Sequence, residues 1–156
     1  MTIALTRDRL AQMQVEISGV EKAFPRAPRS LNVGELPAFV NFAQEATYDR
    51  QTKGSGQALD MRRYEMVLFV AEALDGVEFA AEERAEPFID RVRDHFLARP
   101  GGELDRQPDE QVWYHMRIIG DSGVTFRRYP AETGKGYLTI AFDVEVQDLI
   151  KISYKD

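Results

Sequence analysis

The stretch Tyr137-Leu-Thr-Ile-Ala-Phe-Asp-Val-Glu-Val-Gln147 alternates between two sets of side chains without a break. A period of two predicts a β-strand with one buried face. The apolar face carries Leu138, Ile140, Phe142, Val144 and Val146. At about 3.4 Å per residue the strand would run roughly 37 Å, about twice the usual length. Its backbone needs hydrogen-bonding neighbours of comparable reach, from this subunit or from another, so the strand favours a protein that assembles.

The composition predicts a single domain, residues 1–156, because 156 residues with 44% hydrophobic content can form a packed core. The chain has no cysteine, which fits a reducing cytoplasm and excludes disulfides and thiolate ligands. No run approaches the ~18 apolar residues of a membrane span, and the N-terminus lacks the pattern of a secretion signal. We therefore expect a soluble protein without a membrane partner.

The negative charge is concentrated in one segment of the chain. The net charge is -6; residues 72–110 hold 12 acidic and 5 basic side chains, a net of -7, which leaves 14 acidic and 15 basic elsewhere, a net of +1. Gripping a phosphate backbone requires clustered lysine and arginine, so an acidic chain disfavours tight binding of nucleic acid.

The first half of the chain predicts a helix followed by two strands. Apolar residues spaced by three and four predict a helix over residues 6–24, with Thr6 as its N-cap and Pro25 and Pro28 ending it. Residues 36–48 and 61–73 have the aromatic and β-branched content of strands. The glycine-containing polar residues 49–59 between them predict a mobile hairpin loop.

The second half predicts a helix and three more strands. The helix ends near Ala98 and buries Phe88, Ile89, Val92 and Phe96, and Pro87 should kink it or begin its regular part. Residues 112–119 and 124–129 should pair around a turn at Gly120-Asp-Ser-Gly123, before the long strand. The expected fold class is α+β, with an antiparallel β-sheet of about four to five strands within residues 36–147 and two helices packed on one face.

No residue set predicts catalysis or a cofactor. Gly120-Asp-Ser-Gly123 is similar to the segment around a protease serine, but a hairpin turn explains it better, since only His95 and His115 could serve as a base. Thr133-Gly-Lys-Gly136 lacks the upstream glycine and following Ser or Thr of a phosphate-binding loop. The two histidines lie far apart in sequence, and the acidic residues lack the spacing of a calcium loop. We therefore expect that the protein is not an enzyme and binds neither a metal nor a cofactor.

Two arginine pairs lie within predicted strands, and neighbouring strand residues point to opposite faces. One arginine of each pair must therefore face the helix side or a sheet edge. Such arginines usually pair with carboxylates or extend to solvent, and a subunit contact is the alternative. The pairs are Arg62 with Arg63 and Arg127 with Arg128.

The layout as a whole resembles the tail terminator, or tail completion, proteins of long-tailed bacteriophages and related phage-like particles. The resemblance covers residues 6–147 and rests on the order of elements. These are the N-terminal helix, Gly34-Glu-Leu-Pro37 leading into a strand, the polar loop 49–59, the strand Met66-Val-Leu-Phe-Val70, the helix ending at Phe96-Leu97 and the closing strand from Gly136 to Val146.

The resemblance implies a ring, usually a hexamer, that caps the head-proximal end of the tail tube, stops its polymerisation and joins the tail to the head. The implied partners are further copies of the chain, the tail tube protein and the head-tail connector protein, in a virion assembled in the bacterial cytoplasm. Alternatives are a head completion or neck protein of the same particle, and a small ligand-binding or enzymatic α+β domain, which would show a deep pocket. Candidate contacts with a subunit or the tube are Arg50, Gln51, Lys53, Ser55, Gln57, Arg62, Arg63, Arg127 and Arg128.

The predicted second helix carries a row of carboxylates at four-residue spacing, away from its apolar face. The row consists of Glu82, Glu86, Asp90 and Asp94. An ordinary solvated helix face explains it, since surface helices are usually charged. The functional alternative is an acidic channel wall that lets DNA pass without sticking. The C-terminal residues 149–156 have no assigned place in this scheme.

Overall fold

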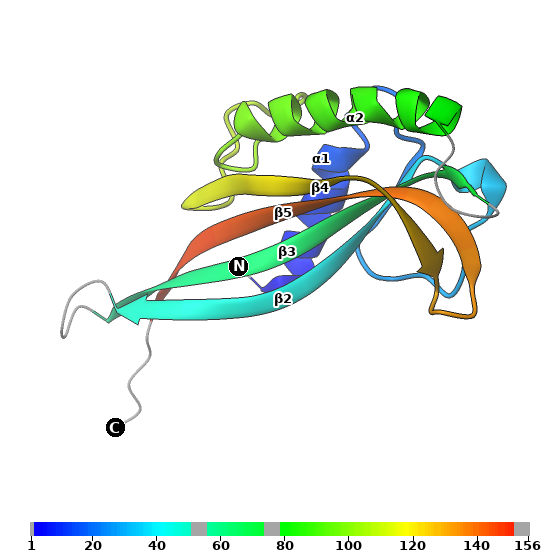
Figure 1. The fold of residues 1–156 in the computed structure, drawn as a ribbon. Coiled ribbons are helices and arrows are strands. Elements are labelled where there is room, and N and C mark those ends of the chain that lie inside the picture. Colours follow the sequence, from blue (N-terminus) through cyan, green and yellow to red (C-terminus); the bar gives the residue numbers. More distant parts are fainter. Residues whose placement is uncertain (1, 51–55, 74–78, 152–156) are drawn as a thin grey trace.

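The computed structural model describes residues 2–50, 56–73 and 79–151, which form one sheet and two helices (Figure 1). The elements in chain order are α1 (Ile3–Gln14), β1 (Lys22–Phe24), the 3-10 helix η1 (Val33–Glu35), β2 (Ala38–Arg50), β3 (Gln57–Glu72), α2 (Phe79–Leu97), β4 (His115–Tyr129) and β5 (Lys135–Lys151). The strand order across the sheet is β1-β2-β3-β5-β4. The predicted α+β class is confirmed.

The sheet is mixed rather than wholly antiparallel. The pairs β2–β3, β3–β5 and β5–β4 are antiparallel, as expected. The short strand β1 instead runs parallel to β2, with Lys22 opposite Ala38. The chain leaves β1, crosses the sheet in residues 25–37 and enters β2 in the same direction, which is the connection that a parallel pair requires.

The long alternating strand is confirmed as β5, and it lies between β3 and β4 in the sheet. It extends further than predicted, to Lys151, because its last residues pair with the start of β3. The five apolar residues of its predicted buried face are all at most 4% exposed. Tyr137 and Thr139 on the other face are also buried, at 1% each, so this end of the strand is covered on both sides.

Both helices pack on one face of the sheet, here called the helix face, as predicted. Their apolar residues share one core with alternate residues of the strands. The shared core includes Leu10, Met13 and Ile17 from the N-terminal segment, Ala85, Phe88, Val92 and Phe96 from α2, and Phe39, Met66, Ile140, Phe142 and Val144 from the sheet. The predicted apolar side of α2 is therefore confirmed. The helix begins at Phe79 and continues through Pro87, so the expectation that this proline begins its regular part is wrong.

The first helix is shorter than predicted, since it ends at Gln14 rather than near residue 24. The Gln14 side chain is fully buried and exchanges two hydrogen bonds with Asn41 of β2, which fixes the end of the helix against the sheet. The chain then turns at Gly19, whose φ of 92° suits glycine, and continues into β1. The N-cap is Thr2, which accepts a hydrogen bond from the Leu5 backbone, and the prediction of Thr6 as N-cap is wrong.

Gly120-Asp-Ser-Gly123 is not a hairpin turn, and the two predicted strands around it are one continuous strand, β4. Two interruptions of the pairing with β5 absorb these residues as bulges. Gly123 has the positive φ expected of the segment, 70°, and its backbone N–H donates to Asp121 at 2.8 Å. The Ser122 hydroxyl accepts from the Ala141 backbone at 2.9 Å, so it holds the bulge to β5. A side chain that bridges to the next strand thus replaces the missing ladder bonds.

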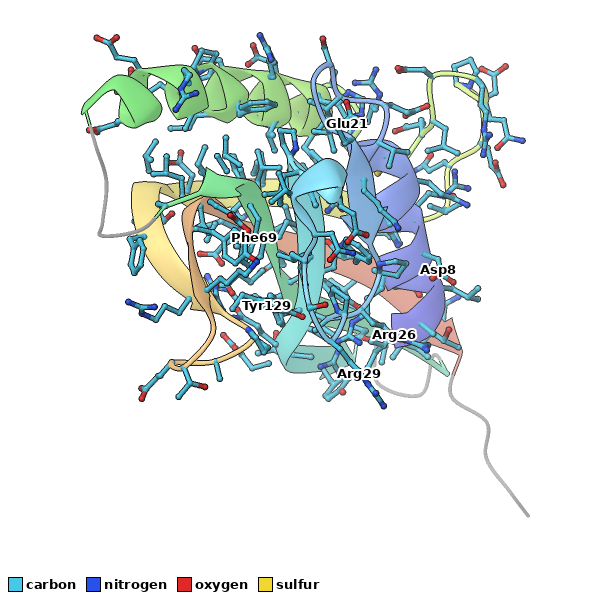
Figure 2. All side chains as sticks on the ribbon, turned by 90° about the vertical axis from the view of Figure 1, so that its right-hand side faces the viewer. Asp8, Glu21, Arg26, Arg29, Phe69 and Tyr129 are labelled. Carbon is cyan, nitrogen blue, oxygen red and sulfur yellow. The ribbon has the colours of Figure 1, made fainter. Side chains whose placement is uncertain are left out.

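The face opposite the helices, here called the far face, is partly covered by residues 24–31, here called the strap (Figure 2). Leu31 of the strap is 3% exposed and packs in a second core with Phe69, Tyr129 and Tyr137. The rings of Tyr129 and Tyr137 both pack against the ring of Phe69 in edge-to-face geometry, at centroid distances of 5.3 and 5.5 Å. Burial raises the pKa of both tyrosines, and each hydroxyl donates a hydrogen bond to the strap.

Candidate assembly interface

Three strands continue together beyond the helices and form an arm (Figure 1). We define the arm as residues 46–50 of β2, 57–62 of β3 and 147–151 of β5, which are paired side by side. The strand β4 begins at His115, opposite Gln147, and β1 pairs only with residues 38–40 of β2. Within the described residues, no further strand runs alongside residues 46–50 of β2 or alongside β5 beyond Gln147, which suits docking of another chain at these two edges.

Both faces of the arm expose apolar side chains. Tyr48, which pairs with Asp60 on the helix face, is 66% exposed. Ile150, on the same face opposite Ala58, is 39% exposed, and Leu149 on the far face is 40% exposed. No described side chain of the arm is buried. At least one face of a β-sheet is normally covered by other parts of the protein. An arm that exposes both faces is therefore typical of a surface that binds another molecule.

The base of the arm is held by Arg62. Its guanidinium donates to the Gln44 carbonyl at 2.8 Å and to the Tyr48 hydroxyl at 3.1 Å. Gln44 lies in the bulge of β2 between Ala43 and Ala46, so Arg62 replaces a hydrogen bond that the bulge removes from the ladder. Arg63 points to the other face and lies 3.8 Å from the carboxylate of Glu45. The prediction that the two arginines face opposite sides is confirmed, and Arg62 serves the arm itself.

The hairpin loop between β2 and β3 is shorter than the predicted residues 49–59. Asp49 and Arg50 still pair with Leu59 and Ala58, so both strands continue into the predicted loop. Gln57 begins β3 opposite Lys151. The structure thus brings Arg50 and Gln57 together at the tip of the arm. The candidates Gln51, Lys53 and Ser55, and the prediction that the loop is mobile, lie outside the described residues.

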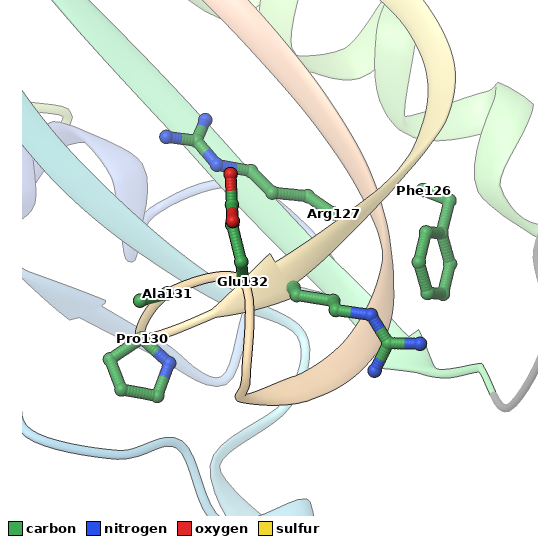
Figure 3. Close-up of a pocket in the computed structure, with 6 residues that line it drawn as sticks. Phe126, Arg127, Pro130, Ala131 and Glu132 are labelled. Atoms are coloured by element: carbon green, nitrogen blue, oxygen red, sulfur yellow. The ribbon is translucent and has the colours of Figure 1, made fainter.

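The second arginine pair lies far from the arm, near the end of β4 (Figure 3). Arg127 pairs with Glu65 at 3.2 Å and lies over the ring of Phe42 on the far face. Arg128 donates to the Gly134 carbonyl at 3.1 Å. A hollow of about 630 Å³ surrounds this strand end, but the two guanidinium groups bind different partners, Glu65 and the Gly134 carbonyl, because neighbouring strand residues point to opposite faces. They do not converge on one point, as the polar groups of a ligand pocket do.

The acidic row of α2 lies on the outer side of the helix, as predicted, but its two halves differ. Asp90 and Asp94 both pair with Arg93, at 3.1 and 3.0 Å. Among the residues that the structure describes, Glu82 and Glu86 have no ion pair. The predicted row is therefore bare of cations only in its first half.

Neither histidine is arranged as a catalytic base. The His95 Nε2 atom is buried without a hydrogen bond, and the nearest carboxylate, that of Glu16, is 3.8 Å away. Burial, together with the positive charge of Arg99, lowers the pKa of His95, so the ring is neutral near pH 7. His115 is exposed at the start of β4. In the described ranges, no group of three or more His, Asp or Glu side chains could hold a metal ion.

The C-terminal residues contribute to the arm, which was not predicted. Residues 149–151 continue β5 and pair with the start of β3. The adjacent apolar residues Leu149 and Ile150 were the available signal, because neighbours in a strand point to opposite faces and both faces must then be apolar.

None of the helices in the described ranges is long and apolar enough to cross a lipid bilayer. No protein-family model matches the chain, and no curated protein matches it either.

Proposed function

We propose that this chain forms a ring, a hexamer by its resemblance, that caps the head-proximal end of a bacteriophage tail tube. In this role it ends polymerisation of the tube and joins the tail to the head connector. The same proposal gives it a place in the neck region of the virion and assembly in the bacterial cytoplasm. It performs no reaction, and DNA passes through the ring without specific binding.

The observation that carries the proposal is the arm. It exposes Tyr48, Leu149 and Ile150 on two faces, and among the described residues no further strand runs alongside residues 46–50 of β2 or alongside β5 beyond Gln147. Closed symmetry covers such edges, because each copy presents one surface and receives the complementary surface of its neighbour. The layout that resembles tail terminators supports the choice of a tail ring among possible assemblies. The hollow at the end of β4, whose two arginines bind different partners, gives less support to a ligand-binding or enzymatic domain.

The test is binding of the purified full chain to tail tubes, with electron microscopy as the readout. We expect rings at one end of each tube and a narrow distribution of tube lengths when the chain is added during polymerisation. Sedimentation velocity gives the mass of the free and assembled forms. A chain that stays monomeric and also leaves tube ends bare contradicts the proposal. Rings found on heads instead of tube ends favour the head completion alternative.

A further inference from the structure

Three side chains from three different strands hold the strap, Asn41 from the helix face of the sheet and Tyr129 and Tyr137 from the far face. Asn41 of β2 donates to the Phe24 carbonyl at 3.0 Å. Tyr129 of β4 donates to the Pro28 carbonyl, and Tyr137 of β5 donates to the Leu31 carbonyl at 3.2 Å. The contacts are spaced along the strap, so its backbone is fixed at the beginning, in the middle and at the end.

The strap presents two arginines to solvent. Arg26 and Arg29 are exposed, and no described residue forms an ion pair with either. They lie near Tyr129, on the side of the molecule away from α2 (Figure 2). Pro25 and Pro28 alternate with them and restrict the backbone further. A rigid backbone reduces the entropy lost on binding, and arginine is enriched in protein interfaces, so this is a surface prepared for an anionic partner.

The same chain has a matching anionic surface on the opposite side of the sheet. Glu82, Glu83 and Glu86 lie on the first half of α2, fully or partly exposed. No cation among the described residues pairs with them, whereas Arg93 forms ion pairs with both Asp90 and Asp94 further along the helix. We call Glu82, Glu83 and Glu86 the glutamate row. The strap and the row cannot meet within one subunit, because the sheet separates them.

We propose that the strap of one copy binds the glutamate row of a second copy, with Arg26 and Arg29 facing its carboxylates. Because the two surfaces differ and lie on opposite sides, the contact is head-to-tail and can repeat around a ring. This inference rests on the proposed function only in requiring that the chain associates with copies of itself; it does not require the ring to bind a tail tube. It gives Glu82 and Glu86 a subunit contact in place of the channel wall that was the functional alternative in the sequence analysis. Paired guanidinium and carboxylate groups then replace bare charges on both surfaces.

The experiment is a charge swap on the full chain, read by sedimentation equilibrium in low salt. Variant one carries R26E and R29E, and variant two carries E82K and E86K. We expect each variant alone to associate at least tenfold more weakly than wild type, since like charges then face each other. An equimolar mixture should recover association, because in an alternating ring every strap meets a helix of opposite charge. The wild-type association should also weaken as salt is raised.

The control is R106E, which makes the same kind of charge reversal as variant one at an exposed arginine outside both surfaces. It should associate like wild type. If the wild type assembles and the R26E and R29E variant assembles equally well, the strap contact is wrong while the ring remains. If both variants are weakened but their mixture does not recover, the strap binds something other than the glutamate row. Salt-sensitive binding of a short DNA duplex that R26E and R29E abolish would replace the second copy with a phosphate backbone. A wild type that never associates overturns the contact, and bare tube ends then also remove the proposed function.

Discussion

Replacing Asn41 with leucine should cost a large part of the stability of the domain. The side chain is 1% exposed and takes part in three hydrogen bonds, two with Gln14 at 2.6 and 2.9 Å and one to the Phe24 carbonyl at 3.0 Å. The substitution leaves the buried Gln14 amide without its donor and its acceptor. At about 1–3 kcal/mol for each unsatisfied buried group, and less for the partly buried carbonyl, we expect a loss of about 3–5 kcal/mol. Typical domains have about 5–15 kcal/mol in total.

Urea unfolding measures this loss, with circular dichroism and the fluorescence of Trp113, the single and nearly fully buried tryptophan, as two probes. The single variant Gln14→Leu should lose about 2–4 kcal/mol, because Asn41 keeps its bond to the strap. The double variant with leucine at both positions should lose only about 1–2 kcal/mol, since two apolar side chains leave no unpaired amide. Losses that simply add in the double variant would show that the two amides do not depend on each other, and the argument would be wrong.

Three further outcomes are expected. Leu149→Glu should fold normally, because the side chain is 40% exposed, and should abolish assembly on tail tubes, whereas Leu97→Glu, at 59% exposure outside the arm, should leave assembly intact; equal effects of the two variants contradict a role for the arm. Burial lowers the pKa of His95 in the folded protein, so its contribution to stability is full above the unfolded pKa and is lost as the pH falls. The variant His95→Gln should therefore flatten the dependence of the free energy of unfolding on pH between about pH 7 and 5. An unchanged slope refutes this. Gly136→Ala should lose about 1–3 kcal/mol, because a Cβ atom there would lie 2.4 Å from a phenylalanine ring and 2.6 Å from a backbone oxygen, while Gly120→Ala, with nothing within 4 Å, should lose little; thermal unfolding compares the two.

The parts of the fold that could be predicted from the sequence are those with a regular local pattern. The alternation in β5 and the apolar spacing of Phe88, Val92 and Phe96 in α2 correctly identified the buried faces. These patterns arise because one large core buries every second residue of a strand and every third or fourth residue of a helix. The solvent-facing row of α2 follows from the same periodicity.

The errors occur where distant residues decide the local structure. Helix α1 ends at Gln14, where the side chain is held by a bond to Asn41, 27 residues away. The bulge in β4 replaces a turn because Ser122 bonds to Ala141, 19 residues away. Neither contact leaves a periodic signal, so local preference predicted a longer helix and a hairpin.

The candidate site was predicted in part. A loop between two strands was correctly predicted. Both strands, β2 and β3, continue further toward it than predicted and form part of the arm. The third strand of the arm was missed because Leu149 and Ile150 interrupt the alternation at the point where the body of the protein no longer covers either face. A pattern based on one buried face does not describe a strand that exposes both.

The strap also determines how late in folding the chain becomes able to bind a second copy. Its hydrogen bonds from Tyr129 and Tyr137 reach back 101 and 106 residues, to Pro28 and Leu31. Contacts of such long sequence separation form only after the intervening loop closes, which slows folding. During synthesis, the strap emerges from the ribosome early, but its two tyrosine hydrogen bonds form only after β4 and β5 have followed. A nascent or truncated subunit therefore presents Arg26 and Arg29 on a backbone that lacks its contacts at Pro28 and Leu31, and only a complete chain offers the fully held surface to its neighbours.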